Sequence, residues 1–298
     1  MTPIPAREIR EKQSVAFRSL LAAVGLTAFK IVVGVATGSL GILAEAAHSG
    51  LDLVASGMTL VAVRLSGRPA DRTHLYGHGK IENLSALAET LLLLATCAWI
   101  AREAVRRLVF HRVIVDITVW SFLVMAVSIA IDFSRSRALA RTAHKYRSQA
   151  LEADALHFRT DIWSSSVVIL GLLAVKAGGW FPPLEFLRYA DAVAALGVSA
   201  LVVWVSARLG RRTVDALMDT APAGMEERIT AAVEAVAGVR NCHNIRIRSS
   251  GPVLFIDLHV LVDGEQTLNQ AHRLTEVIEE AIRRLLPEAD VTVHPEPY

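Results

Sequence analysis

The sequence has little charge and few cysteines, and it lacks several common functional motifs. Charged residues make up 20% of the 298 residues, whereas a soluble globular chain carries about 25%. The two cysteines, Cys97 and Cys242, form no CxxC motif, which fits a soluble part in a reducing compartment. No basic stretch with interleaved aromatic residues indicates a nucleic-acid partner. No apolar run occurs before Gln13, so we expect no cleaved signal peptide.

Apolar residues are concentrated in the first two thirds of the chain. They make up 53% of the sequence, fill most of the region up to residue 210, and thin out after Arg211 and Arg212. The remainder is ordinary amphipathic sequence. We therefore expect two domains, a transmembrane domain at 1–210 and a soluble domain at 211–298.

The apolar region contains six stretches that are long enough to span a membrane, which takes about 20 residues each. An even number of spans places both termini on one side. Lys and Arg are more frequent in the loops on that side, although the Arg102–Arg112 cluster opposes the trend. We therefore expect a multi-pass protein of the inner (plasma) membrane with both termini and the soluble domain in the cytoplasm. The six predicted spans lie roughly at 15–37, 40–65, 83–105, 114–134, 150–177 and 188–208.

The soluble tail shows a mixed pattern of helices and strands. Turn residues separate two β-rich stretches, and Pro287 ends a long amphipathic helix. This order predicts a small α+β domain with both helices on one face of a sheet. The predicted elements are helix 226–236, strands 243–248 and 253–262, helix 268–286 and strand 291–294.

Two predicted spans contain ionisable residues in the same arrangement, a His and an Asp four residues apart, and charge inside a membrane is costly and commonly marks a pathway or a binding site. The second span contains His48 and Asp52, and the fifth contains His157 and Asp161. A spacing of four residues puts both side chains of each pair on one face of a helix. Two such faces opposed would offer two imidazoles and two carboxylates, a ligand set that suits tetrahedral Zn²⁺.

This quartet, His48, Asp52, His157 and Asp161, also predicts how the metal would move. Two carboxylates offset the charge of one Zn²⁺, and they would be expensive to leave bare after the metal departs. Protons would then bind instead, which couples metal movement to proton movement. Two other interpretations stay open: hydrogen-bonded polar pairs that join helices, and a structural zinc that never leaves.

Further histidines form two more groups. Asp71, His74 and His78 follow the second span with spacings that suit one face of a helical turn, and could hold an exchangeable metal or form a solvated polar loop. The tail contributes His243, His259, His272 and His294, on predicted sheet and helix elements.

The chain resembles the cation diffusion facilitators, a family of zinc/proton antiporters. The resemblance is carried by the two intramembrane pairs, the turn Thr37-Gly-Ser-Leu40, the loop stretch Tyr76-Gly-His-Gly-Lys80 and the tail histidines. It implies six transmembrane helices, a ferredoxin-like (metallochaperone-like) cytoplasmic domain, a homodimer in the lipid bilayer and alternating access around the quartet. His48 at the first position resembles the zinc-preferring members, with Cd²⁺, Co²⁺ and Fe²⁺ as alternative substrates.

The resemblance also implies roles for residues outside the quartet. The four tail histidines with Glu296 would bind zinc between the subunits, with Glu296 standing where the family pattern has Asp. Cys242 is either a further ligand or a buried thiol. Lys80 and Asp219 match a charge interlock near the dimer interface, and no organic cofactor is implied.

Two other functions would also account for part of this pattern. An intramembrane metallohydrolase would need an open metal position beside a general base, but no HExxH motif occurs. A membrane-bound metal sensor would explain the tail histidines and leave the quartet without a purpose. We therefore expect a secondary transporter, not an enzyme.

Overall fold

The computed structural model describes residues 5–110, 119–178 and 190–298, which form two compact units. One unit comprises Ala6–Arg64 and Leu84–Thr213 and is helical. The other joins the loop Leu65–Asn83 to the tail Val214–Tyr298. The starts of the spans predicted at 114–134 and 188–208 lie outside the described residues, as does the end of the Arg102–Arg112 cluster.

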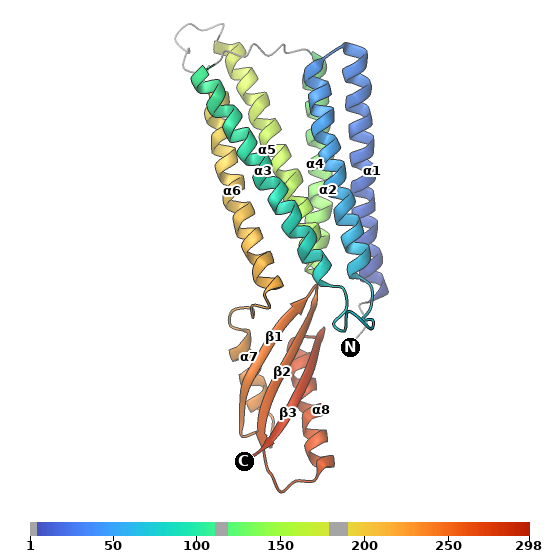
Figure 1. Cartoon of the computed structure of the whole chain (residues 1–298), viewed down its shortest axis with the longest axis vertical. Helices are drawn as coiled ribbons and strands as arrows, with labels where there is room; N and C mark the ends of the chain where they lie inside the picture. The colour runs from blue at the N-terminus through green and yellow to red at the C-terminus, as the bar shows by residue number, and fades with distance from the viewer. Residues whose placement is uncertain (1–4, 111–118, 179–189) are drawn as a thin grey trace. The chain divides into compact units, whose positions relative to one another are not determined.

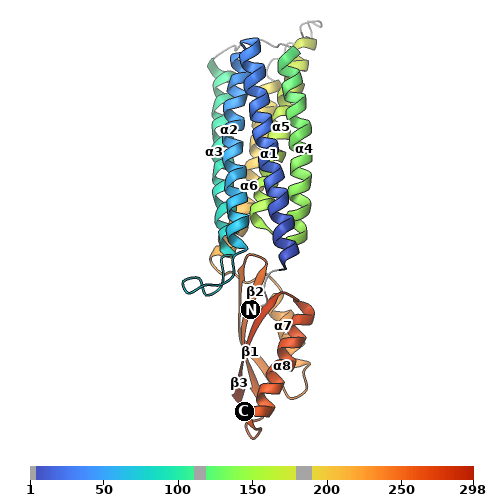
Figure 2. The same cartoon turned by 90° about the vertical axis from the view of Figure 1, so that its right-hand side faces the viewer.

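Six long helices confirm the predicted helical part of the fold, and they run alongside one another in Figures 1 and 2. Within the described ranges, α1 to α4 each contain a stretch long and apolar enough to cross a membrane. The helices are α1 (Ala6–Thr37), α2 (Leu40–Ser66), α3 (Lys80–Phe110), α4 (Val119–Tyr146), α5 (Gln149–Gly178) and α6 (Ala190–Leu217).

Several helices are longer than the predicted spans. The fourth continues to Tyr146, well past the predicted end at residue 134, and the sixth continues to Leu217. The extension of α4 is polar and basic and contains no glycine or proline that would stop the helix, whereas α6 continues through Gly210 and the basic pair Arg211 and Arg212. Hydropathy identifies only the apolar part of a helix, whereas backbone hydrogen bonds continue the helix beyond the end of that part.

Small side chains let the helices of the bundle pack closely. Four alanines are buried in one cluster shared by α1, α2, α4 and α5, around the fully buried ring of Phe158. Helices in a membrane associate mainly by such close packing, because lipid tails are as apolar as the side chains. The buried members of the cluster are Ala16, Leu60, Val63, Leu139, Ala143, Ala150, Leu151, Ala155 and Phe158.

The tail has the predicted element order; the strand predicted at 253–262 has the predicted bounds, and the other two strands are longer than predicted. It comprises α7 (Met225–Glu234), β1 (Asn241–Ser250), β2 (Val253–Val262), α8 (Leu268–Leu285) and β3 (Ala289–Pro297). The central strand pairs antiparallel with β1 and parallel with β3. Pairing along the whole length of β2 extends β3 beyond the predicted residues 291–294.

Both tail helices pack on one face of this sheet, as predicted (Figure 2). The core joins Ile229 of α7, Ile278 and Ile282 of α8, and Ile256 of β2, all fully buried. A capping box begins α8, since Thr267 and Gln270 each bond to the other's backbone N–H group.

The loop before α3 is packed against the β1–β2 turn of the tail. The Tyr76 ring meets the edge of Phe255 at 5.1 Å between centroids, and the Arg248 guanidinium lies 3.6 Å from the Tyr76 ring centroid. A Cβ atom on Gly79 would collide with the backbone of Ser250. Only glycine lets the two chain segments approach so closely.

Candidate metal centres

Helices α2 and α5 bring the predicted intramembrane residues together. His157 Nε2 lies 3.0 Å from Asp52 Oδ1 and 3.6 Å from Asp161 Oδ2. His48 Nε2 is 3.9 Å from Asp161 Oδ1. Ligand atoms on one tetrahedral Zn²⁺ lie about 3.3 Å apart, given bond lengths near 2.0–2.2 Å. The spacing of these atoms therefore suits a shared ion, with His48 slightly farther out.

Two buried atoms of the quartet lack a hydrogen-bond partner among the described residues. They are Nδ1 of His157 and Oδ2 of Asp161. Buried polar atoms are nearly always paired, so unpaired ones need an explanation. The Asp161 oxygen lies 3.6 Å from His157 Nε2, so one cation could bind both atoms. The donor set and this unpaired oxygen both fit a divalent transition metal.

The polar face of α2 is open at one end and closed at the other. The side chains of Glu45, His48 and Asp52 are 50%, 34% and 12% exposed, in that order along the helix. Ser56 and Thr59, on the following turns of the same face, are buried. The quartet is thus reached from the end of the bundle where α1 joins α2.

Sequence reasoning assigned no role to several charged groups near the quartet. Lys30 of α1 is buried and donates to Ser49 Oγ at 2.7 Å and to Glu45 Oε2 at 3.2 Å. Glu89 on α3 and Asp132 on α4 are also buried inside helices of the bundle. The rule that charge inside a span marks a site would have found both acids, had it been applied to every span.

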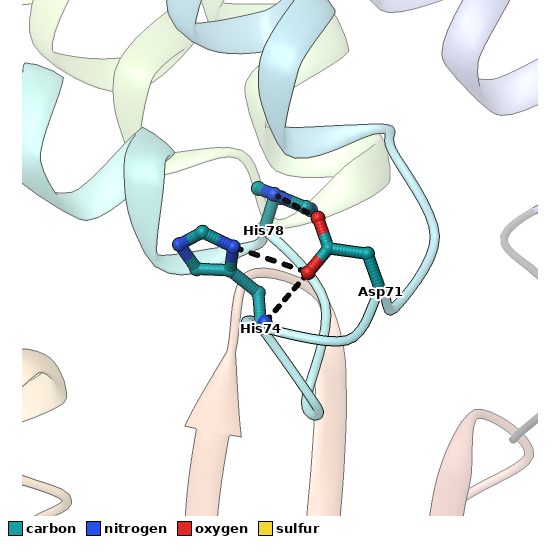
Figure 3. Close-up of side chains that lie close together, drawn as sticks. All are labelled: Asp71, His74 and His78. Carbon is teal, nitrogen blue, oxygen red and sulfur yellow. Dashed lines mark hydrogen bonds and ion pairs between the residues drawn. The ribbon is translucent and has the colours of Figure 1, made fainter.

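The loop residues Asp71, His74 and His78 form a second group, here called the loop cluster (Figure 3). Asp71 Oδ1 lies 3.3 Å from His74 Nδ1, and Asp71 Oδ2 lies 3.4 Å from His78 Nε2. The two rings are 4.4 Å apart between centroids. The predicted helical turn is absent from this described loop, and turns around Gly77 bring the side chains together instead.

Backbone hydrogen bonds hold the Asp71 carboxylate in place. Its Oδ1 accepts from the backbone N–H groups of His74 and Thr73, at 2.7 and 2.8 Å, and from the Thr73 hydroxyl. The bond from the His74 backbone is the largest of the effects that lower the pKa of Asp71 well below its usual value. The loop cluster therefore presents an ionised carboxylate beside two imidazoles, a set that could bind a metal with water as a fourth ligand.

The three strands of the tail place three histidines in one row. His243 on β1 pairs with His259 on β2, which pairs with His294 on β3. Glu296 reaches back over this row: its carboxylate lies 3.2 Å from His243 Nε2, 2.8 Å from His259 Nδ1 and 3.8 Å from His294 Nε2. The hydrogen bond with His259 is the main cause that lowers the pKa of Glu296. These four residues are called the tail cluster.

Two other tail residues lie apart from that cluster. His272 is exposed on α8, where its Nε2 is 3.7 Å from Glu276 Oε1. Cys242 is buried in the core between the sheet and the helices. Burial, and then the charge of Glu234, raise the pKa of the Cys242 thiol to about 11. A neutral buried thiol is a poor metal ligand, which favours a core role.

Comparisons with known proteins match nearly the whole chain. Residues 16–218 match the model of a cation efflux transmembrane domain, and residues 221–298 match that of a cation efflux protein, cytoplasmic domain. The cation-efflux pump FieF of Cronobacter sakazakii is 33% identical over 287 residues, which cover 95% of this chain and 91% of that protein. FieF of Yersinia enterocolitica is 34% identical over 264 residues, which cover 88% of this chain and 84% of that protein.

Some solved structures of similar proteins match a smaller part of the chain. The Zn form of CzrB aligns with 26% of this chain and 89% of its own at 30% identity, with a TM-score of 0.25. The family models and the FieF relatives cover both the helical bundle and the tail, and the family models also cover the quartet, the loop cluster and the tail cluster. The chain therefore belongs to the cation efflux family, the cation diffusion facilitators, and is a membrane transporter of metal cations, not an enzyme.

Proposed function

We propose that this protein exports Zn²⁺ from the cytoplasm in exchange for protons, by alternating access around His48, Asp52, His157 and Asp161. The observation that carries the proposal is the convergence of these four side chains from α2 and α5. Two imidazole nitrogens and two carboxylate oxygens make a ligand set that suits zinc better than it suits harder cations. Cd²⁺, Co²⁺ and Fe²⁺ are secondary substrates on the same ligand chemistry.

Charge balance supports proton exchange at the same site. The Asp52 and Asp161 carboxylates together neutralise one Zn²⁺, and both lie in a largely buried site. Once the ion leaves, two bare carboxylates in a medium of low dielectric constant are unfavourable. Protons on the carboxylates and imidazoles restore neutrality, so metal and protons compete for the same atoms.

The proposed orientation follows from the excess of Lys and Arg in the loops on the side of the termini. With both termini in the cytoplasm, the Thr37–Leu40 turn between α1 and α2 lies outside. The exposed end of the polar face of α2 then points outward, and the buried Ser56 and Thr59 lie on the cytoplasmic side. The described conformation corresponds to a transporter open to the outside.

Zinc would also bind to the loop cluster and the tail cluster, as a regulatory ligand. In the loop, Asp71, His74 and His78 would hold it, and in the tail the row of histidines with Glu296 would do so. His272 is the one predicted tail ligand that lies apart in this chain, on α8. We propose that the protein works as a homodimer, in which the ion pair of Lys80 with Asp219, 2.8 Å long, helps to hold loop and tail together.

Purified protein in proteoliposomes tests the proposal. Zinc should enter the vesicle lumen as protons leave, and the rate should rise with the pH gradient. Asp161→Ala should abolish transport, whereas Glu280→Ala, which removes an exposed acid from α8, should transport like the parent. Zinc movement that ignores the pH gradient would exclude proton exchange. Zinc binding without any flux would favour a sensor.

A further inference from the structure

A second pair of acids is buried in the helical bundle, apart from the quartet. Glu89 on α3 and Asp154 on α5 both have no exposed surface. Each accepts a hydrogen bond from a hydroxyl group of α2: Thr59 donates to Glu89, and Ser56 donates to Asp154 Oδ1 at 3.5 Å. Ser56 and Thr59 are three residues apart and share one helical face. The two carboxyl groups therefore meet α2 on adjacent turns.

One oxygen of each carboxyl group has no hydrogen-bond partner among the described residues. These atoms are Oε2 of Glu89 and Oδ2 of Asp154, and both are buried. An ionised carboxylate with a buried, unpaired oxygen is very unfavourable in a low-dielectric interior. A proton on the carboxyl group removes that charge and turns the oxygen into a donor.

Apolar side chains close off the space around this pair. Glu89 lies between two buried residues of α3 at helical spacing, and Asp154 is flanked by two buried residues of α5. All four belong to one cluster, which also includes a leucine of α6. These apolar neighbours leave the two acids poorly hydrated. The cluster consists of Ala86, Leu93, Ala153, Leu156 and Leu209.

The charges around the pair do not balance without protons. The positive charge of Arg135 on α4 acts on Asp154, but Arg135 also binds Asp132 at 3.1 Å. The charges of Asp154 and His157 act on Glu89. A second permanent cation, Lys30, acts on Asp132 as well, but it is itself bonded to Glu45, so the three buried carboxyl groups outnumber the cations that can neutralise them. Even with the quartet neutral, at least one of the three carboxyl groups must carry a proton. Glu89 is the best candidate, because these contacts place no arginine beside it.

Several contacts hold Arg135 among the described residues, and none of these contacts is with Glu89. Its guanidinium carbon lies 3.5 Å from the centroid of the Phe158 ring. Its nitrogens also contact hydroxyl groups of two other helices, Ser19 of α1 at 3.2 Å and Ser56 of α2 at 3.0 Å. On its own helix, Glu89 also accepts a hydrogen bond from the Ser85 hydroxyl, 3.4 Å from Oε1.

The pair lies next to the quartet on the closed side of the bundle. Ser56 and Thr59 follow Asp52 by four and seven residues, which is about 6 and 10 Å along a helix. Asp154 likewise precedes His157 by one turn of α5. In the proposed orientation, this is the cytoplasmic side, where the polar face of α2 is buried.

We propose that Glu89 and Asp154 form a proton-binding site, separate from the metal quartet, that carries protons between the quartet and the cytoplasm. This inference rests on the proposed metal/proton exchange and adds a second proton site to it. The pair holds one proton on Glu89 while Asp154 is balanced by Arg135. When zinc enters the quartet and displaces protons, the Glu89 proton is released to the cytoplasm and a displaced proton replaces it.

The ligand is a proton and not a second metal ion. The pair offers carboxyl and hydroxyl oxygens, with no imidazole or thiolate in contact among the described residues. Zinc prefers nitrogen and sulfur ligands, and harder cations keep several waters, which the apolar lining does not accommodate.

Two transport assays on the full-length protein in proteoliposomes test this inference. The first measures zinc uptake driven by a pH gradient, and the second measures exchange of labelled for unlabelled zinc at equal pH, which needs no net proton movement. Glu89→Gln keeps the shape of the protonated acid but cannot release a proton. We expect gradient-driven uptake to fall about tenfold or more, while zinc–zinc exchange keeps the parent rate. Glu89→Asp should restore part of the uptake.

A control variant and zinc counting separate the alternatives. Glu152→Gln removes an exposed acid on α5 that pairs with Arg212, and it should behave like the parent in both assays. Equilibrium dialysis should find the same number of zinc ions per subunit in Glu89→Gln as in the parent. One zinc fewer would make the pair a metal site and overturn the inference, as would an equal loss in both transport assays.

The two proposals can fail separately. A parent protein that ignores the pH gradient would overturn the proposed exchange, and this inference with it. A parent that responds to the gradient, with a Glu89→Gln variant that responds equally, would overturn the second proton site alone. Asp154→Asn provides an independent variant of the same pair and should show the same split between the two assays.

Discussion

His157 Nε2 on α5 lies 3.0 Å from Asp52 Oδ1 on α2, although 105 residues separate them in the chain. This contact joins the two halves of the proposed transport site, and each half comes from a single helix. A small relative shift of α2 and α5 would change the ligand distances of the whole quartet. Such a shift is the simplest way for alternating access to bind and release the metal.

The first residue of the quartet should control metal choice. His48→Asp replaces an imidazole nitrogen with carboxylate oxygen, which suits harder cations better. We expect zinc transport to persist and transport of Mn²⁺ or Fe²⁺ to rise relative to it. Competition between labelled zinc and each metal in proteoliposomes measures this ratio. An unchanged ratio would mean that His48, the outermost of the four, does not contact the transported ion.

The tail cluster should depend strongly on Glu296, because its carboxylate lies within 4 Å of three histidines. Glu296→Ala should weaken zinc binding to the tail by about 10- to 100-fold or more. Glu288→Ala, an exposed acid just before β3, serves as the matched control. Calorimetric zinc titration of the full-length protein provides the measurement, and equal affinity in both variants would contradict the assignment.

Cys242 should make the tail less stable in alkali. Its pKa is raised to about 11 in the folded state, against about 8.5 in an unfolded chain. The folded state therefore holds the thiol proton more tightly, and the resulting stability is present below pH 8.5 and lost as the pH rises towards 11. Between pH 8.5 and 11, the free energy of unfolding should fall by up to about 3 kcal/mol more in the parent than in Cys242→Ala.

Denaturant unfolding at several pH values, compared between the parent and Cys242→Ala, measures this difference in slope. The alanine variant has a constant offset from the lost side-chain volume, so only the pH dependence is compared. Zinc binding to the tail should be the same in both proteins. Weaker binding in Cys242→Ala would instead identify the thiol as a metal ligand.

Gly79 should be intolerant of a side chain. Gly79→Ala drives a methyl group into the backbone of Ser250, which cannot move as a flexible side chain could. We expect a loss of about 1–3 kcal/mol of stability in the unit formed by the loop and the tail. Gly25→Ala in α1, where a methyl group would meet open space, is the control. Thermal unfolding of both variants provides the comparison, and equal melting temperatures would show that the loop does not pack on the tail.

Local sequence predicted much of the site because helix periodicity is a local property. His48 with Asp52, and His157 with Asp161, share a helical face wherever the two helices lie. The same holds for the alternation of the tail strands, which puts His259 on the face opposite the core residues Leu258 and Val260. The number of long helices and the order of the tail elements also followed from hydropathy and turn residues.

Other features depend on contacts between segments far apart in the chain. The row of His243, His259 and His294 exists because of the register of three strands. The loop cluster is assembled by turns, where helical spacing had suggested a helix. Glu89 and Asp154 are neighbours only because both bond to α2.

The sequence by itself determined which side chains can share a face. The helix repeats every 3.6 residues and the strand every two, so both periods act over only a few positions. Only the tertiary structure decided that α2 and α5 turn their polar faces towards each other. It also decided which acids are sealed from water. The reason is physical: burial and the pairing of charges depend on helix packing, which involves residues from the whole chain at once.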